Sequence, residues 1–425
     1  MALGRKPIEI VNDGKHQLLA KADHWDRIYL KEVAKVQNGY AFSSDYFSKS
    51  EGMPLIRIRD IDGLKTVDKF RGKYNEDFVV KKGDILIGMD GDFKVARWKG
   101  ENALLNQRVC RIIPDLKKYN DKFLVLCLQP FLDAIHAETS SVTVKHISSK
   151  TIEEIPLPLP SRKEQQAIVS KIEELFSELD KGIENLLLAQ QQLKTYRQSV
   201  LKWAFGGKLT NENVKEGELP EGWKKVKLEQ VAKFLNGDRS KKYPNRNEYV
   251  QDGIPFINTG HIQPNGKLDL ISMNYISREK FNNLNGGKIK NGDLVYCLRG
   301  ATIGKTAFVD QFKEGAIASS LVIIRPNQED LNNKYLYYFL ISPLGKDCIS
   351  QFDNGSAQPN LSAKNLSLYS MPLAIHVEEQ RNIVQTIESR LSVADKMEES
   401  ITQSLQQAEA LRQSILKKAF EGRLV

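Results

Sequence analysis

One stretch of the sequence, RGATIGKT at Arg299–Thr306, has the residue types of a phosphate-binding loop. In such a loop, four residues separate two glycines, so that backbone N–H groups wrap the phosphates beside a lysine and a Ser or Thr hydroxyl. Here only three residues separate Gly300 from Gly304, and Arg299 stands where its side chain would fill the cradle. The following TAFVDQF is β-branched and aromatic rather than strongly helical. A nucleotide-dependent enzyme is therefore the weakest hypothesis.

Histidine and cysteine spacing predicts no metal site. The six histidines form no His-Glu-x-x-His pattern, and no Cys-x-x-Cys pair occurs among Cys110, Cys127, Cys297 and Cys348. We expect these cysteines to be small core residues in a reducing cytosol. The N-terminal sequence lacks the apolar region of a signal peptide, and FLVLCLQPFL is too short to span a bilayer, so we expect a cytoplasmic protein.

Length and charge suggest several domains and an acidic partner. A chain of 425 residues exceeds one ordinary core. Its net charge of +9 and pI near 9.1 favour a polyanionic partner, although solvated lysine faces explain many basic proteins equally well.

The sequence contains an internal repeat, with two copies of one unit. HWDRIYLKEVAKVQNG at His24–Gly39 matches GWKKVKLEQVAKFLNG at Gly222–Gly237 with an offset of 198 residues. The segment Glu164–Thr210 aligns without a gap to Glu379–Val425 with an offset of 215, ending in RQSVLKWAFGGKL and RQSILKKAFEGRL. Each copy is a mixed segment followed by a long helix.

Both repeated helices carry apolar residues at heptad spacing, which favours a coiled coil. Ser161 and Glu164 have capping-box spacing at the first helix start, and Gly207 stands where a C-terminal cap belongs. Each helix could pack on its own mixed segment, or two chains could pair. We favour intramolecular antiparallel pairing, because one chain holds both copies at high effective concentration. The seam positions are Ile168, Ile172, Leu175, Leu179, Gly182, Leu186, Ala189, Leu193, Tyr196 and Val200 in the first helix, and Ile383, Ile387, Ala394, Met397, Ile401, Ala408, Leu411 and Ile415 in the second.

The mixed segments are predicted to be β-rich. Short β-prone runs recur between turns: PLIRIRD, GDILIGM and RVCRIIP in the first copy, and PFINTGHI, GDLVYCL and SLVIIRP in the second. The strand cores agree between copies, whereas the turns differ. RGATIGKT, for example, corresponds to MDGDFKVAR. Similar scaffolds with different polar loops suggest two binding modules, although duplicated loops can also simply drift.

The segment order resembles the specificity subunit of type I restriction-modification enzymes. The resemblance lies in LPEGWKKVKL at Leu219–Leu228, in PSRKEQ at Pro160–Gln165 and in the repeated helix ends, and it covers nearly the whole chain from Trp25. It implies an α+β fold in which two target-recognition domains each read half of a bipartite, asymmetric DNA site. Two paired spacer helices would hold the domains apart and dock methyltransferase subunits. The implied divisions are an N-terminal extension (1–23), recognition domains (24–159 and 211–373) and spacer helices (160–210 and 374–425).

The resemblance also implies the partners and the absence of catalysis. They are double-stranded DNA, two methyltransferase subunits and, through the assembled complex, a restriction and translocase subunit. S-adenosylmethionine, ATP and Mg²⁺ are expected on those partners and no cofactor on this chain, which has no Asn-Pro-Pro-Tyr methyltransferase motif.

A helix from Glu164 to Phe205 would span about 60 Å, somewhat under two turns of DNA at about 34 Å each.

We expect the polar positions that differ between the copies to contact DNA. Lysine and arginine suit phosphates, whereas Arg, Asn, Gln, Ser and His suit base edges. Lys150 and Lys364 occupy matching places and suit a shared role in phosphate contact or turn structure. A coiled-coil scaffold that joins proteins without reading DNA is the alternative. The candidates are Arg57, Arg59, Lys94, Asn106, Gln107, Arg108, Lys145 and His146 in the first copy, and Asn258, His261, Arg299, Lys305, Ser319, Ser320, Gln358 and Asn360 in the second.

Overall fold

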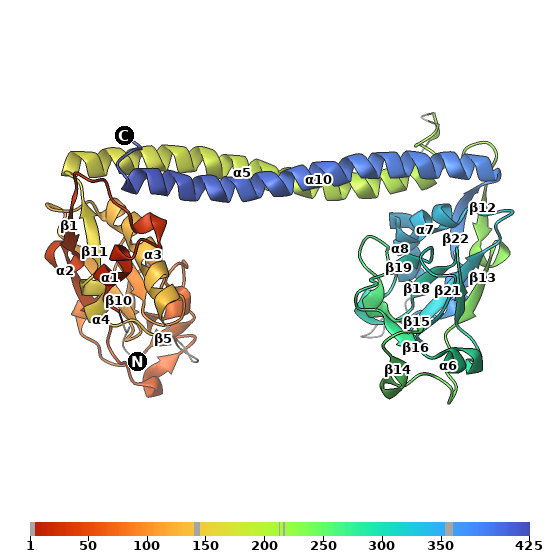
Figure 1. Cartoon of the computed structure of the whole chain (residues 1–425), viewed down its shortest axis with the longest axis horizontal. Coiled ribbons are helices and arrows are strands. Elements are labelled where there is room, and N and C mark those ends of the chain that lie inside the picture. Colours follow the sequence, from red (N-terminus) through yellow and green to blue (C-terminus); the bar gives the residue numbers. More distant parts are fainter. Residues whose placement is uncertain (1–4, 140–144, 212, 216, 353–359) are drawn as a thin grey trace. The chain divides into compact units, whose positions relative to one another are not determined.

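The computed structural model describes residues 5–139, 145–211, 213–215, 217–352 and 360–425. Contacts divide the chain into unit 1, residues 1–186 with 403–425, and unit 2, residues 187–402. Each unit holds a β-rich part and one portion of each of two long helices (Figure 1). The predicted α+β class is therefore confirmed.

The described residues of unit 1 form three sheets of short strands. Their orders are β1-β11, β2-β10-β7-β8 and β3-β5-β4-β9-β6. Neighbours are antiparallel except β4 and β9, which are parallel. The strands are β1 (Asp26–Tyr29), β2 (Ala34–Asn38), β3 (Phe47–Ser48), β4 (Met53–Ile56), β5 (Asp68–Phe70), β6 (Val79–Val80), β7 (Ile85–Gly88), β8 (Val95–Arg97), β9 (Ala103–Leu105), β10 (Val109–Pro114) and β11 (Pro156–Leu159).

Unit 2 repeats this topology, which confirms the internal repeat. Its sheets have the orders β12-β22, β13-β21-β18-β19 and β14-β16-β15-β20-β17, and β15 and β20 form the parallel pair. The strands are β12 (Trp223–Lys227), β13 (Ala232–Asn236), β14 (Tyr249–Val250), β15 (Ile254–Ile257), β16 (Asn274–Ile276), β17 (Lys288–Lys290), β18 (Leu294–Cys297), β19 (Thr306–Phe308), β20 (Glu314–Ile317), β21 (Leu321–Pro326) and β22 (Ser370–Ala374).

The six β-prone runs identified in the sequence all contain strands, namely β4, β7 and β10 in unit 1 and β15, β18 and β21 in unit 2. Strands β7 and β18 lie inside their four-stranded sheets and are buried along their whole length. Continuous apolar runs suit such positions, because both faces of the strand are covered.

Short helices flank the sheets. Helix α3 packs beside β8 and β11, and α7 packs beside β19. Helix α3 accommodates Pro130, whereas the corresponding stretch of unit 2 divides into α7 and α8 at Pro343. The helices are α1 (Pro7–Asn12), α2 (Leu30–Val33), α3 (Asp121–Glu138) and α4 (Ser149–Glu153) in unit 1, and α6 (Arg278–Asn283), α7 (Asn333–Ile341), α8 (Pro343–Phe352) and α9 (Ala363–Ser367) in unit 2.

A glycine marks the crossing from one sheet to the next in each unit. A Cβ atom on Gly39 would lie 2.0 Å from the carbonyl oxygen of Asn106, and one on Gly237 would lie 2.6 Å from that of Ala318. Both glycines end the first repeated motif. Their invariance between the copies is thus explained by backbone packing against backbone.

The long helices α5 (Arg162–Phe205) and α10 (Val377–Phe420) are anchored to their units by a Glu-Gln pair. Glu164 accepts from the Trp25 indole at 3.2 Å, and Glu379 accepts from the Trp223 indole at 2.7 Å. The next residue in each copy, Gln165 or Gln380, is fully buried.

These two glutamines bond to the loops that precede α3 and α7. The Gln165 side chain accepts from the Asn120 N–H at 2.6 Å and donates to the Pro160 carbonyl at 2.9 Å. The Gln380 side chain accepts from the Asn332 N–H at 2.7 Å and donates to the Asp330 and Ala374 carbonyls. Each helix start is therefore fixed to its own β-rich part.

The predicted helix ends are also confirmed. Ser161 and Glu164 form the capping box, since the Glu164 N–H bonds the Ser161 hydroxyl at 3.3 Å and the Ser161 N–H bonds the Glu164 carboxylate at 2.8 Å. Gly207 follows α5 with a φ of 77°, a left-handed conformation that glycine adopts without strain.

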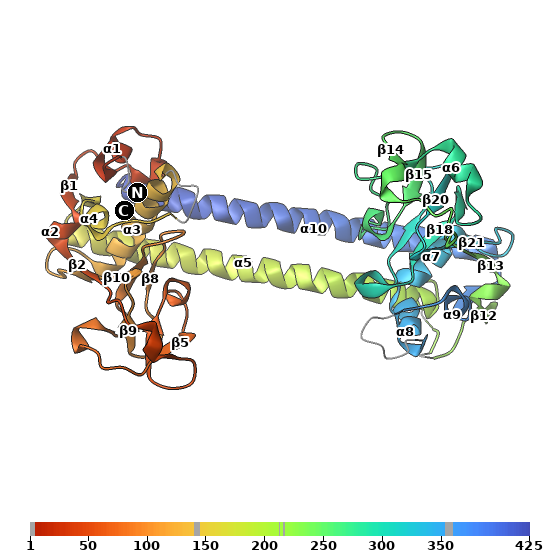
Figure 2. The ribbon, with the colours of Figure 1, turned by 90° about the horizontal axis from the view of Figure 1, so that it is seen from below.

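Within each unit the portions of α5 and α10 run side by side in opposite directions (Figure 2). In unit 1, Arg412 pairs with Asp180 and lies 4.5 Å from the Phe176 ring centroid. In unit 2, Arg197 pairs with Asp395 and bonds Glu398 at 2.8 Å. Intramolecular antiparallel pairing is thus confirmed. Helix starts such as Ile168 and Ile383 also join the cores of their own units.

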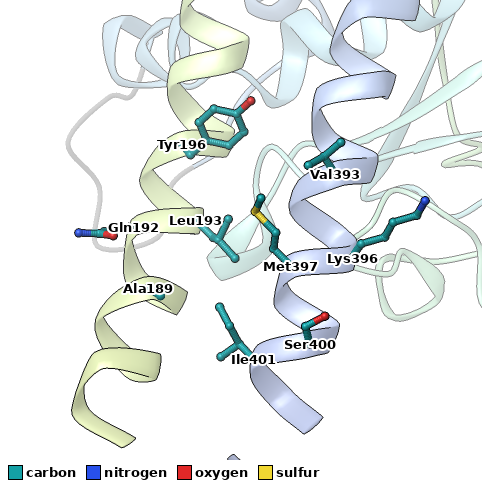
Figure 3. Close-up of a pocket in the computed structure, with 9 residues that line it drawn as sticks. All are labelled: Ala189, Gln192, Leu193, Tyr196, Val393, Lys396, Met397, Ser400 and Ile401. Atoms are coloured by element: carbon teal, nitrogen blue, oxygen red, sulfur yellow. The ribbon is translucent and has the colours of Figure 1, made fainter. Parts of the chain in front are cut away.

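The seam in unit 2 leaves an apolar gap of about 780 Å³. Leu193 and Met397 extend into it from the two helices, whereas Gln192 and Lys396 point away from it (Figure 3). Met397 is 53% exposed although it occupies a predicted seam position. The seam is therefore incompletely closed here.

The N-terminal extension, which has no counterpart in the second copy, covers the end of α10. Ile10 and Leu19 share a core with Ile415 and Phe420. Lys417 donates to the Gln17 side chain at 2.9 Å. The extension is thus part of unit 1.

Candidate nucleic-acid interface

The loop between β18 and β19 contains the phosphate-loop-like sequence, but its backbone amides are already used. The N–H groups of Ile303, Gly304 and Lys305 donate to the carbonyls of Gly300, Cys297 and Thr302 at 3.0, 3.0 and 3.1 Å. A strand, β19, follows the loop instead of a helix. The loop therefore cannot wrap a nucleotide with those three N–H groups, which agrees with the spacing argument.

Matching backbone hydrogen bonds identify equivalent positions in the two units. The Met89 and Leu298 N–H groups bond the carbonyls of Arg108 and Ser320. The Gly88 and Cys297 N–H groups bond those of Lys94 and Lys305. Bridges also join Asp90 to His146 and Arg299 to Asn360. One backbone frame thus carries different polar side chains in each unit.

In unit 1, five of the eight candidates come together around a polar hollow of about 610 Å³, and Asp90 lies beside them. The hollow also has an aromatic edge from Phe42 and Phe47. The five are Arg57, Arg59, Asn106, Gln107 and Arg108.

Carboxylates hold the basic groups of this hollow. Asp68 accepts from Arg57 at 3.0 Å and from Arg59 at 2.6 Å. Burial alone would raise the pKa of Asp68, but the Arg57 hydrogen bond and the Arg59 charge lower it on balance. Asp90 pairs with Arg108 at 3.2 Å and with His146 Nδ1 at 2.6 Å. The guanidinium groups are therefore fixed in orientation and partly neutralised.

Two further unit 1 candidates, Lys94 and Lys145, already have partners within the chain. Lys94 forms an ion pair with Asp62, and Lys145 donates to the His136 carbonyl at 2.6 Å. Asn106, although it lines the hollow, is only 8% exposed. Lys145 and Asn106 are thus poorly placed for a base contact compared with Gln107 and the arginines.

In unit 2, two candidates close a turn rather than face solvent. The Asn258 side chain accepts from the Gly260 N–H at 2.8 Å, and the Asn258 N–H bonds His261 Nδ1 at 3.1 Å. His261 is 4% exposed, and burial lowers its pKa. This burial argues against a base contact by His261.

The other unit 2 candidates are more open. Arg299 is exposed and its side chain has no ion pair among the residues that the structure describes, whereas Asp90, its counterpart, has two basic partners. Ser319 and Ser320 form the half-buried turn between β20 and β21. Asn360 bridges Arg299, and Lys305 lines a separate hollow. Gln358 lies outside the described residues.

Lys150 and Lys364 occupy the first turns of α4 and α9. Ser148 and Ser362 cap these short helices by accepting from the N–H groups of Thr151 and Asn365 at 3.1 and 3.0 Å. The two lysines thus share one structural setting, as their alignment in the sequence indicated.

Sequence reasoning missed the acidic partners Asp62, Asp68 and Asp90. The antiparallel pairing of β4 with β5 brings Asp68 close to Arg57. No local sequence pattern predicts this contact. It also missed the tie made by Gln165 and Gln380, although the repeated Glu-Gln was the available signal.

Among the described residues, no group of three or more His, Cys, Asp or Glu side chains could hold a metal ion. All four cysteines are buried and free, and burial raises the pKa of Cys110 to about 12. A search of the same residues finds no helix long and apolar enough to cross a membrane.

Comparisons with known proteins agree with this architecture. The family described as type I restriction modification DNA specificity domain matches residues 22–189 and 220–407. The chain is 35% identical to the type I restriction enzyme EcoBI specificity subunit of Escherichia coli, over 98% of this chain and 90% of that protein. The HsdS subunit from Thermoanaerobacter tengcongensis shares the fold, with a TM-score of 0.59 and 20% identity over 95% of this chain and 98% of its own.

A second solved chain, from work on assembly and conformational transition of the type I R-M system, gives a TM-score of 0.71 at 19% identity, covering 95% of this chain and 99% of its own. These two likenesses concern the fold alone. The family match falls once on each repeat and covers most of the sequence. This match disfavours the alternative of a scaffold that does not bind DNA. The chain belongs to the type I restriction-modification DNA specificity family.

Proposed function

We propose that this chain reads a bipartite, asymmetric DNA site, with residues 24–159 reading one half and residues 211–373 the other. The observation that carries the proposal is the shared backbone frame whose equivalent positions differ in charge, with Asp90, Arg108 and His146 replaced by Arg299, Ser320 and Asn360. Two domains with the same backbone and different hydrogen-bonding side chains suit the recognition of two different half-sites.

The paired helices, within residues 160–210 and 374–425, are proposed to set the spacing between the half-sites and to dock two methyltransferase subunits. Exposed apolar side chains on the helices support a protein partner, because their contact with water is unfavourable and a bound protein would bury them. They include Leu187, Leu188, Val393, Met397 and Leu411.

Catalysis is assigned to the partners in this proposal. The methyltransferase subunits would bind S-adenosylmethionine, and a restriction and translocase subunit would use ATP and Mg²⁺. This chain would contribute recognition only, and we place it in the cytoplasm because its proposed partner is cellular DNA.

Exchange of residues 24–159 for the same region of a relative with a different target tests the proposal. The chimera, assembled with methyltransferase subunits, should methylate a site altered in one half and unchanged in the other, as read by sequencing methylated DNA. A chimera that changes both halves, or neither while remaining active, would contradict the modular reading.

A further inference from the structure

The hollow of unit 2 that Lys305 lines has a volume of about 460 Å³ and is also lined by residues of α8 and α5. Its rim carries two lysines, Lys305 and Lys346, and two carboxamides, Gln198 and Gln263. All four residues are exposed. None of these side chains has a hydrogen-bond or ion-pair partner within the described part of the chain, and no described acid lines the hollow.

Two lysines lining one hollow, with no acid among its lining residues, favour an anion there. The floor is apolar, with Ile341 and Ile349 contributing to it. Water screens charge less beside such a floor, so an anion contact there is stronger than on a flat polar surface.

The two lysines and the occupied loop amides favour a phosphodiester over a nucleotide or a base. Lysine offers a compact, mobile charge without the planar fork that arginine uses on guanine. The backbone N–H groups of Ile303, Gly304 and Lys305 are occupied, so they cannot hold a chain of phosphates. Arg299, a base-contact candidate, comes from the same loop, so DNA engaged by Arg299 would present its backbone nearby.

Resting on the proposed function, we infer that Lys305 and Lys346 form a phosphate clamp for the backbone of the bound DNA. The clamp adds affinity without sequence preference. Unit 1 has no equivalent clamp among its described residues, because Lys94, which occupies the place of Lys305, is closed onto Asp62.

The test compares Lys305→Gln, Lys346→Gln and the double variant of the full chain, in complex with methyltransferase subunits. Binding to the specific duplex and to an unrelated duplex is measured over a salt series. The double variant should weaken both by a similar factor. The slope of log affinity against log salt should become shallower by about 0.9 for each phosphate that the variant no longer neutralises.

Lys225→Gln, at an exposed lysine of β12 that lines neither hollow, is the matched control and should leave the slope unchanged. Unaltered slopes in a double variant with normal circular dichroism would overturn the clamp. Weakening confined to the specific duplex would also overturn it, since that indicates base reading, as would reduced affinity for methyltransferase alone, which indicates an acidic protein surface. A wild-type complex without sequence-specific, salt-dependent DNA binding would instead refute the proposed function.

Discussion

Units 1 and 2 carry side chains of different charge on matching backbone hydrogen bonds. After the buried strand of each four-stranded sheet, unit 1 places Asp90 between Arg108 and His146, whereas unit 2 places Arg299 at the same point. The first unit balances its basic groups with nearby acids, and the second exposes them. The comparison teaches that the frame tolerates reversal of charge at its edge, while the helix anchors Gln165 and Gln380 stay the same.

The largest expected effect tests the shared part of this comparison. Gln165→Ala and Gln380→Ala each remove a buried side chain that satisfies backbone groups, and each orphaned group should cost about 1–3 kcal/mol. Denaturant unfolding should show similar losses for both variants, with faster hydrogen exchange at the Asn120 or Asn332 amide. Gln191→Ala, an exposed change on α5, is the control. A loss in only one unit would break the equivalence of the two anchors.

A smaller effect tests the part that differs. Arg299→Ala should reduce discrimination at one base pair by about 1–3 kcal/mol, the range of a good side-chain contact with a base edge. Asp90→Ala should release Arg108 and His146 and alter preference in the other half-site. Competition binding with single-base variants of the target measures both. Lys225→Ala on β12 should do neither, and a change in the wrong half-site would contradict the assignment.

The smallest effect concerns the capping box of α5, which α10 lacks. Hydrogen bonds from the Ser161 side chain and backbone, and from Trp25, lower the pKa of Glu164 to about 2. Its contribution to stability is therefore complete above about pH 4.5, where the unfolded glutamate is ionised, and disappears as pH falls toward 2. Because Glu164 is 39% exposed, the effect should stay below about 1 kcal/mol.

Thermal unfolding of Glu164→Gln and wild type between pH 7 and pH 2 measures this contribution. The difference in melting temperature should be constant down to about pH 4.5 and shrink below it. Glu378→Gln, in the exposed first turn of α10, serves as the control. A difference that does not depend on pH would show that hydrogen bonding, rather than charge, carries the effect.

The sequence predicted the scaffold well because repetition and periodicity report directly on burial. The core strands, the heptad seam and the antiparallel pairing followed from these patterns, with Met397 and Leu411 as exposed seam positions. The candidate site was less predictable. Lys94 and Arg57 form ion pairs with acidic residues that only the fold brings close to them. His261 lies in a turn in which its own ring accepts a hydrogen bond from the Asn258 N–H.

Gly39 and Gly237 limit how this family could be engineered or could diverge. The polar side chains of the loops can be replaced without disturbing the backbone contact between the sheets. A methyl group at either glycine would instead clash with the backbone of the neighbouring sheet and change the orientation of those loops. A graft of loops between two such proteins should therefore keep the orientation of its polar side chains only if the glycine at this backbone contact is kept.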